Sequence, residues 1–138
     1  MKKYSLGLYE KAMPGTLDWK EKLEAAKEAG YDFVEISIDA TEEKIARLDM
    51  TKEDRFEIIK AMYEVGMPIR TMCVSALTKY SLGNDKEEYC KRGMEILEKS
   101  LRLADDLGIR VVMIPGYDVY YEPSTKESVE AFLEGMRW

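Results

Sequence analysis

Polar side chains suited to acid–base chemistry or to hydrogen bonding with a polyol recur at the ends of four predicted strands. They are Tyr9 and Glu10, Glu35 and Ser37, Cys73 and Ser75, and Tyr117 and Asp118. Sites on parallel α/β sheets form beyond the carboxyl ends of the strands, so these corresponding positions should converge on one place. There, Glu10 or Glu35 could act as a base, bind a polyol or orient a substrate.

Both carboxylates also have simpler interpretations. Glu10 could be a solvated charge at a strand end, and Glu35 could pair with Arg70 or Arg110 across the sheet. We favour a functional role for Glu35, because a carboxylate inside a strand costs several kcal/mol if it is buried without a partner. For Glu10 both interpretations stay open.

Two other features near the strand ends have alternatives of the same kind. The aromatic loop of residues 116–121, which contains Tyr117, could stack on a sugar, or its rings could cover one end of the core. Cys73 could be a nucleophile, but in a chain without histidine it is expected to be a small buried hydrophobe.

Strands must position these side chains, and apolar runs predict four of them, at residues 4–9, 30–39, 69–76 and 109–114. The second strand alternates two sets that lie on opposite faces, Val34, Ile36 and Ile38 against Phe33, Glu35 and Ser37. The fourth strand is almost entirely apolar, which is typical of a parallel strand covered on both faces.

Helices are expected between these strands and after the last one. Their predicted starts are Thr16 or Asp18, a point within residues 39–49, and capping motifs at 51–54, 85–88 (with Asp85 as the cap) and 124–127. Apolar spacing predicts the buried faces of the last three helices as Phe56, Ile59, Met62 and Tyr63, then Cys90, Met94, Leu97, Leu101, Ala104 and Leu107, then Val129, Phe132 and Leu133.

A repeat connects the elements. Three helices are predicted to end at a glycine that leads directly into a strand, at Gly30, Gly66 and Gly108, with spacings of 36 and 42 residues. Strand–helix units of this length predict right-handed crossovers and a parallel sheet. The chain holds four such units, whereas a closed barrel needs eight and about 250 residues. The pattern therefore predicts either an open four-stranded α/β sheet or half of a barrel.

Composition limits the classes of function. The 138 residues suit one domain, and the net charge of −6 argues against nucleic acid or an anionic membrane as a partner. No apolar run approaches the roughly 20 residues that span a bilayer. No apolar signal core follows Met1, Lys2 and Lys3, so a cytoplasmic location is expected. The chain has no histidine for catalysis or metal binding, and its two cysteines are expected to be reduced.

Six blocks of the chain, in this order and spacing, resemble the L-ribulose-5-phosphate (L-xylulose-5-phosphate) 3-epimerases of the xylose-isomerase-like barrel superfamily, also described as hexulose-6-phosphate isomerases. The blocks are residues 6–12, 30–39, 47–49, 72–76, 108–112 and 116–121. The resemblance covers almost the whole chain. It implies that residues 1–138 are a single incomplete barrel domain, the N-terminal half (about four βα units) of a TIM (βα)₈ barrel, truncated before the C-terminal strands.

The resemblance also implies a function. The family substrate is a phosphorylated ketopentose, and L-ribulose 5-phosphate and L-xylulose 5-phosphate are interconverted by metal-assisted proton transfer at C3. The divalent metal (Mn, Mg or Zn) has its ligands on later strands that are absent from this chain, so no catalytic residue is expected here and the isolated chain is expected to be inactive. By resemblance, the substrate-binding residues are Tyr9, Glu10, Glu35, Ser37, Ser75 and Tyr117.

One departure and two alternatives accompany this expectation. Leu77 stands where the family usually has a histidine, which affects substrate contacts on that loop. The first alternative is a non-catalytic α/β module that binds a sugar phosphate or a protein. It differs from the enzyme in that only the enzyme requires a set of metal ligands. The second is another reaction of the superfamily, of which endonuclease activity is disfavoured by the acidic charge. Open edges at the first and fourth strands predict self-association or pairing with the missing C-terminal half.

Overall fold

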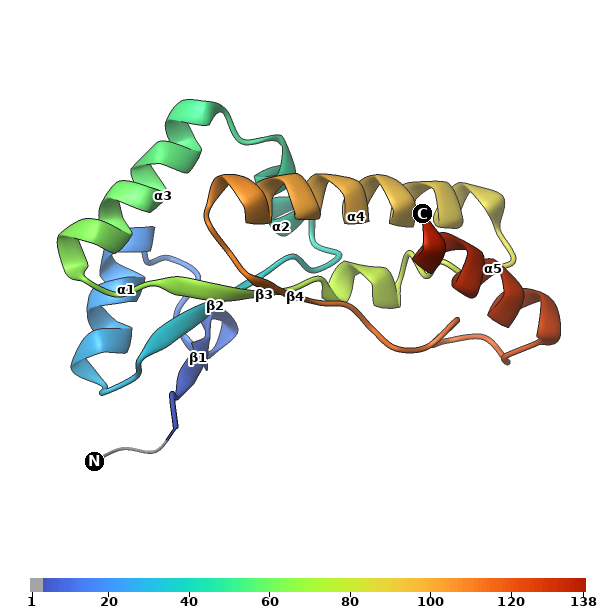
Figure 1. Ribbon diagram of the computed structural model, residues 1–138, viewed down its shortest axis with the longest axis horizontal. Helices are drawn as coiled ribbons and strands as arrows, with labels where there is room; N and C mark the ends of the chain where they lie inside the picture. Colours follow the sequence, from blue (N-terminus) through green and yellow to red (C-terminus); the bar gives the residue numbers. More distant parts are fainter. Residues whose placement is uncertain (1–3) are drawn as a thin grey trace.

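The computed structural model describes residues 4–138, which fold around one four-stranded parallel sheet in the order β1-β2-β3-β4 (Figure 1). The strands are β1 (Gly7–Tyr9), β2 (Phe33–Ser37), β3 (Ile69–Cys73) and β4 (Val111–Met113). All four predicted strands are confirmed, and each is shorter than expected. Met1, Lys2 and Lys3, which entered the expectation about a signal segment, lie outside the described residues.

Helices connect the strands and gather on one face of the sheet (Figure 1). They are α1 (Trp19–Glu28), α2 (Glu42–Ala46), α3 (Lys52–Val65), α4 (Glu87–Asp106) and α5 (Lys126–Arg137), with 3-10 turns η1 (Glu10–Ala12), η2 (Arg47–Asp49) and η3 (Ser75–Thr78). The predicted glycine junctions are confirmed. Gly30, Gly66 and Gly108 have φ of 84°, 69° and 70°, the left-handed conformation that a helix end favours.

Side-chain capping confirms most of the predicted helix starts. Asp18, Thr51 and Thr125 each accept a hydrogen bond from a backbone amide in the first turn of α1, α3 and α5. The expectation that Asp85 caps α4 is wrong, because the N-cap is Lys86. Asn84 Oδ1 instead accepts a hydrogen bond from the Lys86 amide at 3.0 Å and forms the turn that precedes the helix.

The core lies between the sheet and the helices. Val34, Ile36, Met72 and Val74 point into it and are fully buried. The opposite face of the sheet carries no helix in the described part of the chain (Figure 1), and we call it the bare face. The expectation that the fourth strand is covered on both faces is therefore wrong. On the bare face, the side chains of Val111 and Met113 in β4 are 55% and 51% exposed.

Three of the predicted helix faces differ from the observed ones. In α3 the buried residues are Ile58, Ala61 and Val65, while Phe56 and Tyr63 are exposed. Both sets have helical spacing, so periodicity alone did not distinguish them. In α4, Leu101 is exposed, and small residues at Gly93 and Ser100 extend the buried stripe that contains Leu97 and Ala104. In α5, Val129 and Leu133 are exposed and Phe132 is half-buried.

The remaining expectations concern cysteines and membranes. Cys73 and Cys90 are both free thiols, as expected, and each is half-buried. Within residues 4–138, none of the helices has the length and apolar character required to cross a bilayer.

Candidate functional site at the carboxyl ends of the strands

Strand register brings the predicted polar side chains into rows on the bare face. Tyr9 in β1 is paired with Glu35 in β2, and Glu35 is paired with Thr71 in β3. One pleat closer to the carboxyl ends, Ser37 is paired with Cys73. The period of two along each strand places both rows on the same side of the sheet. The structure thus brings together Tyr9, Glu35 and Ser37, which the sequence predicted as site residues.

Glu35 lies in the middle of the bare face. Its Oε2 accepts a hydrogen bond from Thr71 Oγ1 at 2.7 Å, and the side chain is half-buried. The alternative that Glu35 pairs with Arg70 or Arg110 is wrong, since no such ion pair forms within the described residues. Arg70 instead lies over the ring of Phe33, 5.8 Å from its centroid. The second carboxylate oxygen of Glu35 has no hydrogen-bond partner among residues 4–138.

Tyr9 and Ser37 form a hydroxyl pair at the carboxyl ends of β1 and β2. Tyr9 Oη lies 2.9 Å from Ser37 Oγ, and Ser37 is fully buried. Burial raises the pKa of Tyr9 above its usual 10.0, although its hydrogen bond with Ser37 opposes this effect. At neutral pH both groups are uncharged hydroxyls that can donate or accept a hydrogen bond.

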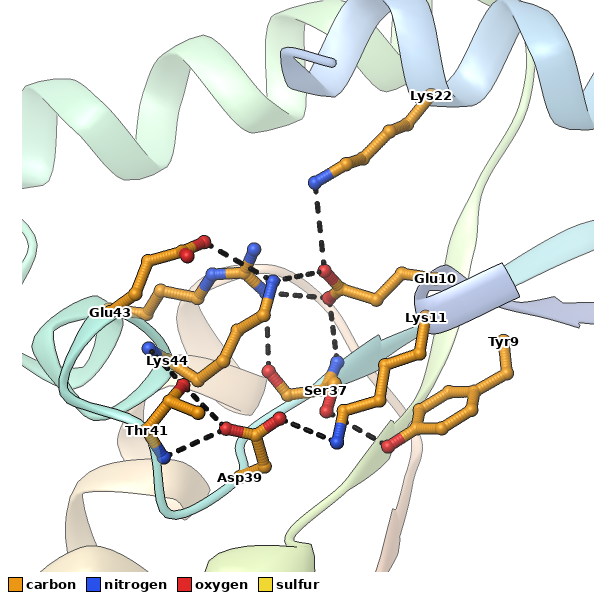
Figure 2. A network of polar contacts seen from close by, with 10 residues as sticks. Tyr9, Glu10, Lys11, Lys22, Ser37, Asp39, Thr41, Glu43 and Lys44 are labelled. Atoms are coloured by element: carbon orange, nitrogen blue, oxygen red, sulfur yellow. Dashed lines mark hydrogen bonds and ion pairs between the residues drawn. The ribbon is translucent and has the colours of Figure 1, made fainter. Parts of the chain in front are cut away.

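Glu10 lies directly after β1 but does not face solvent. Only 2% of the residue is exposed, so the alternative of a solvated charge is wrong. Its Oε2 accepts hydrogen bonds from the Ser37 amide at 2.7 Å and from Arg47 Nη1 at 2.5 Å. Its Oε1 accepts one from Lys44 Nζ at 2.8 Å and lies 3.7 Å from Lys22 Nζ (Figure 2). We call Glu10 with Lys22, Lys44, Arg47 and Ser37 the Glu10 cluster.

The Glu10 cluster holds three cations around one carboxylate. Burial alone would raise the pKa of Glu10, but the hydrogen bonds and charges of Arg47 and Lys44 outweigh it and lower that pKa below its usual value. Burial lowers the pKa of Lys22. The charge of Glu10 opposes this shift, and the charges of Lys44 and Arg47 add to it. Lys22 and Arg47 also pack against the ring of Trp19, at 5.2 and 5.1 Å from its centroid.

The Glu10 cluster fixes the segment that follows β2. Arg47 Nη1 also donates to the Ser37 carbonyl oxygen at 3.2 Å, so Arg47 and Glu10 together bind both backbone groups of Ser37. At the solvent side of the cluster, Lys11 Nζ lies 2.5 Å from Asp39 Oδ2, and Asp39 Oδ1 accepts two hydrogen bonds from Thr41, the N-cap of α2 (Figure 2). The end of β2 is therefore held from both sides.

Sequence reasoning did not find Lys22, Lys44 or Arg47. Each lies on a helix or turn where a basic residue normally indicates a solvated surface. Two features of the sequence could have indicated that these basic residues are buried. Lys22 directly precedes the core residue Leu23, and Lys44 and Arg47 are three residues apart, which places both on one side of the segment formed by α2 and η2.

The carboxyl ends of the four strands and the loops that follow them form a rim. Ser75 and Tyr117 lie on the part of this rim that follows β3 and β4. Ser75 begins η3 and is half-buried. Tyr117 follows β4, and its Oη lies 2.7 Å from Thr78 Oγ1 in η3. The ring of Tyr120 lies 5.2 Å from that of Tyr117. Leu77, at the position where a histidine was expected from the resemblance, is 4% exposed and belongs to the core.

The described residues do not fit a divalent metal. The chain has no histidine, and residues 4–138 contain no group of three or more Cys, Asp or Glu side chains placed to share an ion. Both oxygens of Glu10 are already bound by cations, and Glu35 is a single carboxylate on the bare face. A metal at this site would need ligands from outside the described residues.

Comparisons with known proteins agree with this architecture. The sequence pattern of the family described as Xylose isomerase-like TIM barrel matches residues 23–138. The chain is 44% identical over 138 residues to SgbU of Escherichia coli (strain K12), whose proposed activity is that of an L-ribulose-5-phosphate 3-epimerase, and covers 48% of it. It is 40% identical over 136 residues to the L-ribulose-5-phosphate 3-epimerase UlaE of Escherichia coli O157:H7, covering 99% of this chain and 48% of UlaE.

Solved structures support the fold. A D-psicose 3-epimerase crystallised with D-fructose superposes with a TM-score of 0.74 at 16% identity, over 96% of this chain and 46% of that one. An L-ribulose 3-epimerase superposes with a TM-score of 0.66 at 20% identity, over 95% and 43%. The chain thus spans about half the length of the curated relatives that it matches, and its four strand–helix units correspond to the N-terminal half of an eight-stranded barrel.

Proposed function

Because this chain belongs to the xylose isomerase-like TIM barrel family, we propose that it forms one wall of the substrate site of a sugar-phosphate 3-epimerase. The proposed reaction interconverts L-ribulose 5-phosphate and L-xylulose 5-phosphate. The observation that carries the proposal is the 40–44% identity to SgbU and UlaE along almost the entire chain. Since the chain spans 48% of each, the complete activity is proposed for an assembly that contains the other half as well.

The chemistry of 3-epimerisation defines what each wall must do. The proton on C3, next to the C2 carbonyl, is removed from one face and returned to the other, so a base is needed on each face of the substrate. The enediolate formed between the two steps needs positive charge or hydrogen-bond donors nearby. The family uses a divalent metal here, and this chain contributes no ligand set for it.

We assign binding and orienting roles to the residues of the bare face. Glu35, with one oxygen fixed by Thr71, has a free oxygen that can accept a hydrogen bond from a substrate hydroxyl. The Tyr9–Ser37 pair can donate to or accept from a neighbouring hydroxyl. Ser75 and Tyr117 extend the same rim toward β4. A carboxylate and four hydroxyl groups suit the polyol part of a ketopentose phosphate.

Glu10 has a different role in this proposal. Its carboxylate is buried and accepts hydrogen bonds from the Ser37 amide, Lys44 and Arg47, so a substrate hydroxyl has no access to it. We assign it as a positioning residue that holds Ser37 and the start of α2. Substrate contact on this side then falls to Tyr9 and Glu35, while Ser37, which is itself fully buried, orients the Tyr9 hydroxyl.

A second candidate is a non-catalytic module that binds a sugar phosphate through the same rim. It is favoured by the lack of a histidine in the chain and of a shared carboxylate cluster in the described part of it. Both candidates use the same substrate-binding residues. They differ in whether turnover appears when the other wall is supplied.

The test is reconstitution. The chain would be co-expressed with the C-terminal half of SgbU, and the turnover of L-ribulose 5-phosphate would be measured with Mn²⁺ or Mg²⁺. We expect no turnover from either half alone and measurable turnover from the pair. In the pair, Glu35→Gln should raise KM or lower kcat at least tenfold, which corresponds to about 1.4 kcal/mol. The matched change Glu28→Gln, at an exposed position of α1, should leave both constants unchanged.

The outcomes separate the two candidates. A stable pair that binds substrate without turnover would favour the binding module. A pair whose activity is equally insensitive to both substitutions would contradict the role of Glu35.

A further inference from the structure

The hydroxyl pair at the carboxyl ends of β1 and β2 has a direction that burial decides. Tyr9 Oη lies 2.9 Å from Ser37 Oγ, and on distance alone either oxygen could be the donor. Ser37 is fully buried, whereas Tyr9 is half-buried at the rim. A buried hydroxyl proton without an acceptor is as unfavourable as a lost hydrogen bond. The Ser37 proton therefore needs an acceptor inside the protein, and the Tyr9 proton does not.

The surroundings of Ser37 leave one acceptor for its proton. Among residues 4–138, the only hydrogen-bond partner of Ser37 Oγ is Tyr9 Oη. The Ser37 carbonyl oxygen already accepts from Arg47 Nη1 at 3.2 Å, and the Ser37 amide donates to Glu10 Oε2 at 2.7 Å. Because both backbone groups of Ser37 are held in this way, the strand end is fixed with the serine hydroxyl next to the tyrosine oxygen.

A cation near Tyr9 favours the same direction. Lys11 Nζ lies 2.5 Å from Asp39 Oδ2, on the side of the site where the Tyr9 hydroxyl ends (Figure 2). Burial raises the pKa of Tyr9, and the positive charge of Lys11 is among the effects that oppose this rise. A positive charge near a phenolic oxygen favours an arrangement in which this oxygen accepts and its own proton points away.

We propose that Ser37 is a positioning residue, which donates its proton to Tyr9 Oη so that Tyr9 presents its own proton to the substrate. A phenol that accepts one hydrogen bond is a stronger donor of another. Glu35, the partner of Tyr9 in the strand register, has a carboxylate oxygen that only accepts. The rim therefore offers one donor and one acceptor on neighbouring strands.

This arrangement defines the kind of substrate atom that each residue binds, and it rests on the proposed function. Glu35 binds a hydroxyl group, because its free oxygen needs a donor. Tyr9 binds an oxygen without a proton, which in a ketose phosphate is the C2 carbonyl oxygen or a phosphate oxygen. At the C2 oxygen the hydrogen bond would strengthen as the enediolate forms, whereas at the phosphate it would contribute equally before and during the reaction.

The first test is the infrared C–O stretching band of Tyr9, measured on the chain alone as the difference between the original chain and Tyr9→Phe. The position of this band distinguishes a phenol that accepts a hydrogen bond from one that only donates. We expect the band of an accepting phenol in the original chain, and Ser37→Ala should convert it to that of a phenol that does not accept. The matched control Ser100→Ala removes another fully buried serine hydroxyl, in α4, and should leave the band unchanged.

The band of the original chain decides the direction even if Ser37→Ala does not fold. A band showing that Tyr9 only donates would overturn the proposal, because its proton would then be directed to Ser37 rather than to the substrate.

The second test uses the chain reconstituted with the C-terminal half of SgbU. Tyr9→Phe should lower kcat/KM about tenfold and Ser37→Ala about threefold, while Ser100→Ala should behave like the original chain. A loss in kcat identifies the acceptor as the C2 oxygen. A rise in KM, together with weaker inhibition by inorganic phosphate, identifies it as a phosphate oxygen.

An unchanged kcat/KM in Tyr9→Phe would overturn the contact between Tyr9 and the substrate. A pair without any turnover would contradict the proposed reaction instead, and the infrared band would still decide the direction of the hydrogen bond.

Discussion

At the scale of single residues, the Glu10 cluster shows how a strand end is fixed by charge. Lys22, Lys44 and Arg47 are each less than a tenth exposed, and Glu10 is the carboxylate they share. The carboxylate offsets the cost of burying these cations: it accepts hydrogen bonds from Lys44 and Arg47 and forms an ion pair with Lys22. In the described part of the chain, removing the negative charge of Glu10 would leave Lys22 and Arg47 without a counter-ion, and Lys44 with only the exposed Glu43 at 3.5 Å.

We therefore expect Glu10→Gln to lower the free energy of unfolding by about 3 kcal/mol. The measurement is urea denaturation at neutral pH. The matched change Glu28→Gln, on the exposed side of α1, should cost less than about 0.5 kcal/mol. Equal stability of the two variants would show that the cluster does not depend on its carboxylate.

Asp39 gives a prediction about pH. Burial raises its pKa, but Lys11 and the two hydrogen bonds from Thr41 outweigh this and lower the pKa from 3.8 to about 2. The folded state therefore binds a proton less readily than the unfolded state. The resulting stabilisation is present above pH 3.8 and is lost as the pH falls toward 2, with a magnitude of roughly 2 kcal/mol. Glu10, whose pKa is also lowered, acts in the same direction.

The pH dependence can be assigned by substitution. Between about pH 4 and pH 2, the free energy of unfolding of Asp39→Asn should fall less steeply than that of the original chain. If the two slopes are equal, the Lys11–Asp39 pair does not contribute to acid sensitivity.

At the scale of elements, one glycine connects two loops on the rim. The Gly83 amide donates to the Asp118 carbonyl oxygen at 3.1 Å, and Asp118 Oδ2 accepts hydrogen bonds from Ser124 and Ser128. A Cβ at position 83 would lie 2.4 Å from the Ser128 carbonyl oxygen and 2.7 Å from that of Asp118. The loop that carries Tyr117 is thus packed directly against the backbone that precedes α4.

Gly83→Ala should force these loops apart and lower the free energy of unfolding by about 1–3 kcal/mol. Hydrogen exchange should become faster in residues 117–128. Gly116→Ala is the matched control, because a Cβ there has no neighbour within 4 Å. Unchanged exchange in the Gly83→Ala variant would show that the loops are not coupled.

The elements also show what sequence can predict. Strand–helix order, the three left-handed glycines and the caps at Asp18, Thr51 and Thr125 followed from local chemistry. The buried faces of α3 and α4 did not, because several faces of each helix carry apolar residues and only packing chooses between them. The grouping of Tyr9, Glu35 and Ser37 near the carboxyl ends of neighbouring strands was predicted from the strand ends, and their binding of a substrate stays a prediction. The basic partners of Glu10 were not, since their burial depends on contacts between residues 12 to 37 positions apart.

At the scale of the whole molecule, the sheet has one packed face and one bare face. The packed face buries a continuous apolar core under α1, α3 and α4. The bare face gathers Tyr9, Glu35 and Ser37 near the carboxyl ends, with the exposed apolar side chains of Val111 and Met113 along β4. In our proposal, one side of the sheet stabilises the fold and the other binds the substrate. We propose that the polar part of the bare face binds a sugar phosphate.

The most direct measurement is a titration of the ¹⁵N-labelled chain with L-ribulose 5-phosphate, followed by amide chemical shifts. We predict that the amide chemical shifts of Tyr9, Glu35, Ser37, Ser75 and Tyr117 change. The changes should be smaller when inorganic phosphate is added alone. Glu35→Gln should weaken the response, whereas Glu28→Gln should preserve it. If these amides do not move, or if the shifts appear instead in the cavity of about 790 Å³ between the ends of α3 and α4, the bare face is not the substrate wall.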